Sequence, residues 1–202
     1  MKTRNLSVLL AALFVIAGSI VSAGARAEGE VPAPPAIGST IEDFTLPDVD
    51  NKDRSLKSLA GKNGTVLLFI AVQCPVSNAY NERMAKLAED YKAKGIAVIG
   101  INSNVAEDAA AVKAHATEHK LSFPILKDPG NKIADKLGAS VTPEAYFIDV
   151  HNKLLYHGRI DNSRNPAQVE TNDLRNALDA ALNDKPVEKT EAKAFGCTIK
   201  RA

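Results

Sequence analysis

The sequence lacks several features that mark common functional classes. Its 25 basic and 24 acidic residues give a net charge of +1, so there is no positive excess for binding nucleic acid or an anionic membrane. It also has no glycine-rich loop that would cradle a phosphate, and no internal repeat. Any chemistry must therefore come from a few individual side chains.

Cysteine is scarce, with only Cys74 and Cys197 in 202 residues. In an exported chain, two cysteines favour a disulfide or a redox role over two idle thiols. A structural disulfide between them would stabilise the fold by about 4–5 kcal/mol in the chain-entropy model. In a catalytic pair, the disulfide would instead form and break during the reaction.

The N-terminus predicts export. Lys2 and Arg4 precede an apolar run over 6–21, and a small-x-small pattern ends at Ala27. This pattern predicts a secretory signal peptide over 1–27, cleaved near Ala27, and hence a secreted or periplasmic protein. No cysteine stands at the cleavage site, so a lipid anchor is not expected, and nothing predicts membrane attachment after cleavage.

The mature chain is long enough for one domain. Removing the predicted signal peptide takes away three basic residues and no acidic residue, which changes the net charge to −2. We predict a Pro- and Ala-rich linker over 28–36, one domain with a substantial core over 37–185, and a C-terminal tail over 186–202 that carries Cys197. The sequence does not indicate an oligomeric state.

One stretch near the middle organises the prediction. An unbroken apolar run over 65–72 predicts a strand buried on both faces. Cys74 and Pro75 follow, and helical spacing continues over 76–94, so Cys74 lies at or just before a helix N-terminus. That position favours a thiolate, because helix N-terminal N–H groups stabilise negative charge. A small buried hydrophobic side chain is the alternative interpretation.

The flanking segments predict further strands and helices around this unit. After Asn102, Ser103 or Asn104 is expected to cap the next helix. We predict a hairpin over 40–46 and 53–59, strands over 96–101, 123–126, 144–149 and 154–160, helices over 107–119, 131–137 and 170–182, and an extended charged tail over 187–193 that lets Cys197 move along the surface.

Two histidines have the spacing of a possible metal site. His115 and His119 lie four residues apart, as on a two-histidine metal face. No carboxylate completes a zinc pattern around them, so we interpret them as part of a solvated polar face. We predict no metal site and no cofactor.

The order of these segments resembles the thioredoxin fold. More closely, it resembles the redoxin branch, the alkyl hydroperoxide reductase/thiol-specific antioxidant (AhpC/TSA) superfamily. The resemblance covers about 37–200 and is carried by the cysteine after the first central strand, by Thr-Pro before a later strand, and by the segments 41–48, 95–104, 123–128 and 195–200. It implies an α/β, thioredoxin-like three-layer fold with a central mixed sheet between helices and an N-terminal β-hairpin.

The resemblance also implies roles for individual residues. Cys74 would be the reactive cysteine, followed by Pro75, and Pro143 would be a cis-proline facing it. Thr142 would offer its backbone to a bound peptide or mixed disulfide, and Cys197 would be the partner or resolving cysteine.

A positive charge beside the thiolate is a further implied feature. Arg159 could supply it, as an arginine does in peroxiredoxins, although a solvated edge-strand arginine is an equal alternative.

Two departures from the family pattern limit the functional prediction. A CxxC motif would need cysteine at position 71, where this chain has Ala71. The peroxiredoxin pattern Pro-x-x-x-Thr-x-x-Cys is also missing, because positions 67 and 71 are Leu67 and Ala71. The local dithiol and the usual peroxide pocket are therefore both absent.

Two functional hypotheses remain. The first is an extracytoplasmic thiol oxidoreductase with antioxidant or thiol–disulfide exchange activity, in which Cys74 attacks a hydroperoxide or a protein disulfide and Cys197 resolves the product. It would need an external thiol as electron donor. The alternative is a non-catalytic binding module in which Cys74 and Cys197 form a permanent disulfide. A copper carrier would need more soft ligands around Cys74 than the sequence offers.

Overall fold

The structure is a computed structural model that describes residues 31–201. The predicted signal peptide, over 1–27, lies outside this part of the chain, as do the first residues of the predicted linker. Within residues 31–201, none of the helices combines the length and the apolar character needed to cross a bilayer.

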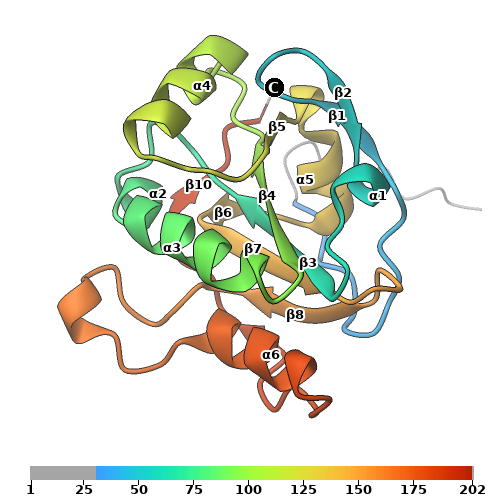
Figure 1. Ribbon diagram of the computed structural model, residues 1–202. Coiled ribbons are helices and arrows are strands. Elements are labelled where there is room, and N and C mark those ends of the chain that lie inside the picture. Colours follow the sequence, from blue (N-terminus) through green and yellow to red (C-terminus); the bar gives the residue numbers. More distant parts are fainter. Residues whose placement is uncertain (1–30, 202) are drawn as a thin grey trace, which may run out of the picture. The chain divides into compact units, whose positions relative to one another are not determined.

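A six-stranded mixed sheet forms the centre of the fold (Figure 1). Its strand order is β5-β4-β3-β7-β8-β9, and β3 is parallel to β4 but antiparallel to β7. The strands are β3 (Gly64–Phe69), β4 (Ile96–Asn102), β5 (Ile125–Lys127), β7 (Glu144–Ile148), β8 (Leu154–Gly158) and β9 (Glu191–Ala192).

Two short strand pairs accompany this sheet. β1 (Thr45–Pro47) and β2 (Asp53–Ser55) form an N-terminal hairpin as predicted, but its strands are shorter than expected. The predicted strand over 53–59 is wrong after Ser55, which caps a helix over Leu56–Leu59. β6 (Val141–Thr142) pairs antiparallel with β10 (Cys197–Thr198). The second pair brings the C-terminal segment back to the strand that precedes Pro143.

Helices cover both faces of the sheet, which gives the predicted three layers (Figure 1). Helices α3 and α6 pack on one face, whereas α1 and α5 pack on the other. The helices are α1 (Leu56–Leu59), α2 (Pro75–Asn78), α3 (Asn81–Lys92), α4 (Ala109–Glu118), α5 (Lys132–Leu137) and α6 (Asp173–Leu182), with 3₁₀ turns η1 (Pro129–Asn131) and η2 (Pro166–Gln168).

Strand β3 shows why the sheet must lie inside. Successive strand side chains point to opposite faces, so Val66 and Leu68 enter the core beneath α3 and α6, whereas Leu67 and Phe69 enter the core beneath α5. All six residues of β3 are buried. The unbroken apolar run in the sequence is explained by this two-sided burial.

The helix predicted over 76–94 is in fact two helices. Helix α2 ends after one turn, and α3 begins at Asn81. At this break Tyr80 is buried, and its hydroxyl donates to Asp161 at 2.8 Å. The apolar spacing was correct for α3, but it does not show a break between two helices that pack on the same core.

The predicted cap of α4 was also wrong. The N-cap is Asp108, whose carboxylate accepts the N–H of Ala111 at 2.7 Å. Ser103 and Asn104 are buried, and their side chains bind Asp128 and Glu107. They serve a polar cluster between the strand and the helix.

The C-terminal tail is held in place by two strands. Strand β9 adds to the edge of β8, and β10 pairs with β6. The prediction that the tail lets Cys197 move along the surface therefore differs from the structure. The charged composition of 187–193 did not reveal that strand pairing would hold the backbone of the tail in place.

Candidate functional site

Cys74 lies where the sequence predicted, between strand β3 and a helix. It is the N-cap residue of α2, Pro75 occupies the first helical position, and the Ser77 N–H donates to the Cys74 sulfur at 3.2 Å. The thiol is only 2% exposed, and its Sγ lies 3.3 Å from the Thr142 carbonyl oxygen. The sulfur is therefore fixed by backbone groups from two different segments.

The Thr142–Pro143 peptide bond is cis, as the resemblance implied. It stands between β6 and β7, so the Thr142 carbonyl faces Cys74. The structure thus brings together four of the predicted site residues, Cys74, Pro75, Thr142 and Pro143. Their roles in catalysis remain predictions.

Cys197 reaches the same place from the C-terminal segment. In the pairing of β10 with β6, Cys197 stands directly opposite Thr142, and the Ile199 N–H donates to the Ser140 carbonyl at 3.0 Å. The Ile199 side chain is 3% exposed and packs in the core beneath α5. An apolar anchor therefore holds the strand that carries the second cysteine.

Gly196 permits this close approach. A Cβ at this position would lie 1.9 Å from the Thr142 carbonyl oxygen, which is backbone and cannot rotate away. Only a residue without a side chain lets β10 lie against β6 in the observed register. The Gly-Cys order in the sequence thus has a direct steric reason.

The two thiols differ in acidity. Both cysteines are free, and the Cys197 thiol donates a hydrogen bond to the Cys74 sulfur. Burial opposes ionisation of Cys74, but hydrogen bonds donated by the Cys197 and Thr142 side chains and by the Ser77 N–H outweigh it and hold the pKa of Cys74 below its usual value. The hydrogen bond to Cys74, together with burial, raises the pKa of Cys197. This difference favours a Cys74 thiolate beside a Cys197 thiol, so Cys74 is the candidate nucleophile.

A buried carboxylate that sequence reasoning missed supports the segment before Cys74. Glu107 is 3% exposed, and its two oxygens accept the N–H groups of Val72 and Gln73, each at 2.9 Å. These hydrogen bonds, with those from Asn102 and Asn104, outweigh burial and lower the pKa of Glu107. The loop that leads into Cys74 is thereby held by a fixed negative charge.

A second buried carboxylate supports the segment before the cis-proline. Glu144 Oε2 accepts the N–H groups of Ser140 and Val141, at 2.8 and 3.2 Å. Its other oxygen lies 2.6 Å from His157 Nε2 and 3.4 Å from the Tyr146 hydroxyl. The two segments that flank Cys74 are thus held in the same way, each by one buried glutamate.

Sequence signals for these two glutamates existed but were weak. Strands β3 and β4 are parallel neighbours, so their carboxyl ends lie at the same edge of the sheet. Polar residues after β4 could therefore have been expected beside Cys74, which follows β3. The predicted helix over 107–119 includes Glu107, but the spacing does not show that this polar side chain is buried.

Arg159 is engaged in an ion pair. It follows β8, and its Nε donates to Asp173 at 2.7 Å, where Asp173 is the buried first residue of α6. This ion pair raises the pKa of Arg159. Its predicted role beside the thiolate stays a prediction.

The histidine pair differs from its interpretation. His115 is buried, with Nε2 3.2 Å from Asn81 Nδ2, and its ring centroid is 4.3 Å from that of His119. His119 is half-buried, so the predicted solvated face does not describe either ring. No group of three potential metal ligands among His, Cys, Asp and Glu occurs within residues 31–201.

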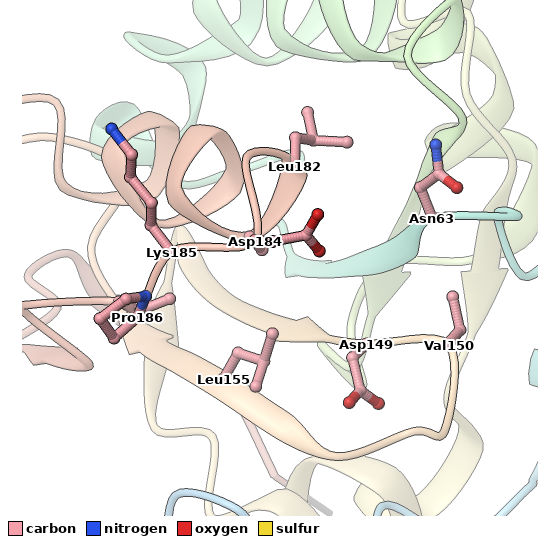
Figure 2. Close-up of a pocket in the computed structure, with 10 residues that line it drawn as sticks. Asn63, Asp149, Val150, Leu155, Leu182, Asp184, Lys185 and Pro186 are labelled. Atoms are coloured by element: carbon pink, nitrogen blue, oxygen red, sulfur yellow. The ribbon is translucent and has the colours of Figure 1, made fainter.

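A separate cavity lies away from the cysteines. It has a volume of about 550 Å³ and lies between the β7–β8 turn, Asn63 and the end of α6 (Figure 2). Asp149, Asp184 and Leu182 line it, and its lining contains no cysteine or histidine. We therefore assign the candidate active site to the two thiols.

Comparisons with known proteins identify the family of the chain. The model of the AhpC/TSA family matches residues 37–157. The chain is 30% identical over 118 residues to the thiol-disulfide oxidoreductase ResA of Halalkalibacterium halodurans, covering 58% of this chain and 65% of ResA. It is 34% identical over 126 residues to the chloroplastic peroxiredoxin Q of Triticum aestivum, covering 59% and 57%. The chain thus spans less than two thirds of either relative.

Solved structures extend the similarity over a larger share of the chain. A hypothetical protein of Sinorhizobium meliloti 1021 is 33% identical, with a TM-score of 0.77 over 84% of this chain and 97% of that protein. Structures under 25% identical, among them a peroxidoxin of Mycobacterium tuberculosis, share the fold, which is thioredoxin-like. The family match covers more than half of the chain, so this protein belongs to the AhpC/TSA family.

Proposed function

We propose that this protein is an extracytoplasmic thiol oxidoreductase in which Cys74 attacks the substrate and Cys197 resolves the product. The observation that carries the proposal is the register of β10, which sets Cys197 opposite Thr142, the residue whose carbonyl oxygen lies 3.3 Å from the Cys74 sulfur. A thiol held beside the reactive sulfur is what a resolving cysteine requires. The names of the similar proteins, a thiol-disulfide oxidoreductase and a peroxiredoxin, agree with thiol chemistry.

With a protein disulfide as substrate, two exchange steps complete the reaction. The Cys74 thiolate attacks one sulfur of the substrate, so that a mixed disulfide forms and the other substrate sulfur leaves as a thiolate. The Cys197 sulfur, after losing its proton, then attacks Cys74 and releases the second substrate thiol. The substrate is reduced by two electrons, the Cys74–Cys197 disulfide forms, and an external dithiol restores the two free thiols.

With a hydroperoxide as substrate, the same two residues would act in the same order. Cys74 attacks the outer peroxide oxygen, which yields a sulfenic acid and an alcohol or water. The Cys197 thiol then condenses with the sulfenic acid, and water leaves as the disulfide forms. We favour disulfide exchange, because Leu67 and Ala71 replace the residues that shape a peroxide pocket.

Cysteine variants of the mature chain test the proposal. We expect Cys74→Ser to abolish both the reduction of a protein disulfide by dithiothreitol and the turnover of hydrogen peroxide. Cys197→Ser should still perform the first step and accumulate a mixed disulfide, which mass spectrometry detects. Full turnover by Cys74→Ser in either assay would refute the proposal.

A second candidate is a binding module with a permanent Cys74–Cys197 disulfide. Its supporting observation is the burial of Cys74 and of Ile199, which shields the Cys74 sulfur from solvent, although Cys197 stays partly exposed. The reduction potential of the pair separates the two candidates. A value above about −250 mV indicates a bond that turns over, and a value below about −300 mV indicates a structural bond.

We also propose that the chain acts outside the cytoplasm, with residues 1–27 as a signal peptide, 28–36 as a linker, and 37–185 as the redoxin domain ahead of the tail at 186–202. The support is the charge, length and cleavage pattern of the first 27 residues. Cell fractionation and N-terminal sequencing of the mature protein test this. A cytoplasmic protein that begins at Met1 would contradict it.

A further inference from the structure

The Glu107 cluster connects the two segments that carry the cysteines. We use this name for the side chains of Asn102, Asn104, Glu107 and Lys127. They lie between the carboxyl end of β4, the start of α4 and β5, and all of them except Lys127 are buried. Such a group of polar side chains inside a fold is costly unless every member is satisfied, so its partners identify what it holds.

One side of the cluster holds the backbone before Cys74. Glu107 takes the Val72 and Gln73 N–H groups on separate oxygens, and Asn102 Nδ2 reaches the Ile70 carbonyl at 3.3 Å. Gln73 is the residue directly before Cys74. The path of the loop, and with it the position of the sulfur, is therefore set by this carboxylate.

The other side of the cluster holds the backbone after Cys197. Asn104 Oδ1 accepts the Lys200 N–H at 2.8 Å, and the Val105 N–H donates to the Lys200 carbonyl at 3.1 Å. Lys200 follows Ile199, the buried anchor of β10. Both backbone polar groups of Lys200, its N–H and its carbonyl, are therefore hydrogen-bonded, which holds the tail just after Cys197.

Asn104 joins these two sides. Its Nδ2 donates to Glu107 Oε1 at 3.0 Å while its Oδ1 accepts from Lys200. The Lys127 ammonium donates to the Glu107 carbonyl, to Asn102 Oδ1 and, at 3.3 Å, to the Asn104 carbonyl. The positive charge of Lys127 offsets the buried negative charge of Glu107, and its hydrogen bonds hold the segment 102–107 in place.

We propose that Asn104 and Glu107 are positioning residues that fix the Cys74 loop and the Cys197 segment to each other. Together they keep β10 docked over the Cys74 thiol, so the strength of these hydrogen bonds sets how often the thiol becomes accessible. This inference rests on the proposed pairing of the two cysteines, but it concerns the docking of the segment and not the turnover of a substrate.

The test measures accessibility of Cys74 directly. In a Cys197→Ser background, Cys74 is the single cysteine, and its alkylation by iodoacetamide at fixed pH requires opening of the docked segment because the thiol is 2% exposed. Asn104→Ala removes the hydrogen bond to Lys200 and the link to Glu107. We expect alkylation about tenfold faster, which corresponds to about 1.4 kcal/mol of lost docking. Glu107→Gln should act in the same direction.

Asp149→Ala is the matched control. Asp149 also accepts two backbone N–H groups, those of His151 and Lys153, both at 2.8 Å, but at the β7–β8 turn beside the cavity of Figure 2. We expect it to lower the melting temperature without changing the alkylation rate. The rate change would then report the local role of Asn104 and not general destabilisation.

Two results would overturn the inference. One is an alkylation rate of Asn104→Ala within twofold of its parent, and the other is an equal acceleration by Asp149→Ala. If Glu107→Gln does not fold, Asn104→Ala decides by the same criterion. Alkylation needs no substrate, so loss of the proposed oxidoreductase activity and failure of this inference are separate outcomes.

Discussion

Replacing Gly196 with alanine should separate the two cysteines without touching either. The added Cβ would lie 1.9 Å from the Thr142 carbonyl oxygen and 2.6 Å from its carbon, well inside the about 3.5 Å at which nonbonded atoms attract. Both contacts are backbone atoms, so no side-chain rotation relieves them. Strand β10 must therefore move away from β6.

The magnitude follows from what this movement disrupts. The backbone hydrogen bonds of β10, including that of Ile199 to Ser140, are each worth about 0.5–1.5 kcal/mol. Partial exposure of Ile199 adds a share of the about 1.5–3 kcal/mol that burying such a side chain contributes. A combined loss of about 2–4 kcal/mol corresponds to a decrease of about 30-fold or more in the equilibrium constant for docking of the segment.

The assay is the disulfide equilibrium of the Cys74–Cys197 pair with glutathione, read by mass spectrometry. We expect the effective concentration of Cys197 at Cys74 to fall by about 30-fold or more in Gly196→Ala, since this concentration is proportional to the equilibrium constant for docking. Gly38→Ala is the control. It also replaces a glycine, at φ +84°, but the added Cβ would meet no atom within 4 Å, so it causes no steric clash. An unchanged equilibrium in Gly196→Ala would refute the steric argument.

Three further predictions follow from the charged groups. The pH profile of Cys74 alkylation should have its midpoint below the about 8.5 of a free cysteine, because hydrogen bonds lower its pKa; a midpoint at or above that value would contradict this. Arg159→Ala should lower the free energy of unfolding, measured in urea, by about 1–3 kcal/mol, because buried Asp173 loses a charged donor. A shift in the pH profile of Cys74 alkylation in this variant would instead support a role for Arg159 as the positive charge beside the thiolate. The lowered pKa of Glu107 contributes stability that is complete above the ordinary carboxyl pKa of about 4.3 and is lost as the pH falls through the lower folded-state pKa. The difference in unfolding free energy between the wild type and Glu107→Gln should therefore shrink in acid. A difference that stays constant with pH would contradict this.

The sequence was sufficient for the fold because its apolar pattern is strong. The run over 65–72 reports burial on both faces of a sheet, and the structure has β3 there. The position of Cys74 before Pro75 likewise predicted a cysteine at a helix N-terminus, and the structure makes it the N-cap. Periodicity and turn chemistry are local, so they can be read from neighbouring residues.

The supporting residues of the site could not be predicted in the same way. Glu107 lies 33 residues from Cys74 in sequence, and its burial depends on parallel packing of β3 and β4. Likewise, only the pairing of β10 with β6 shows why Cys197 follows Gly196. Contacts between distant segments are set by the assembled sheet, and composition gives no sign of them.

The pairing of β10 with β6 also has a consequence for biosynthesis. Cys197 follows all strands of the central sheet and α6 in the chain, so a growing polypeptide exposes Cys74 to its surroundings long before its partner has been made. Until Cys197 has been made, the Cys74 thiol has no second thiol in the same chain and can react only with oxidants or with thiols of other molecules. Completion of the C-terminal segment is therefore the event that changes Cys74 from a solitary thiol into one member of a pair.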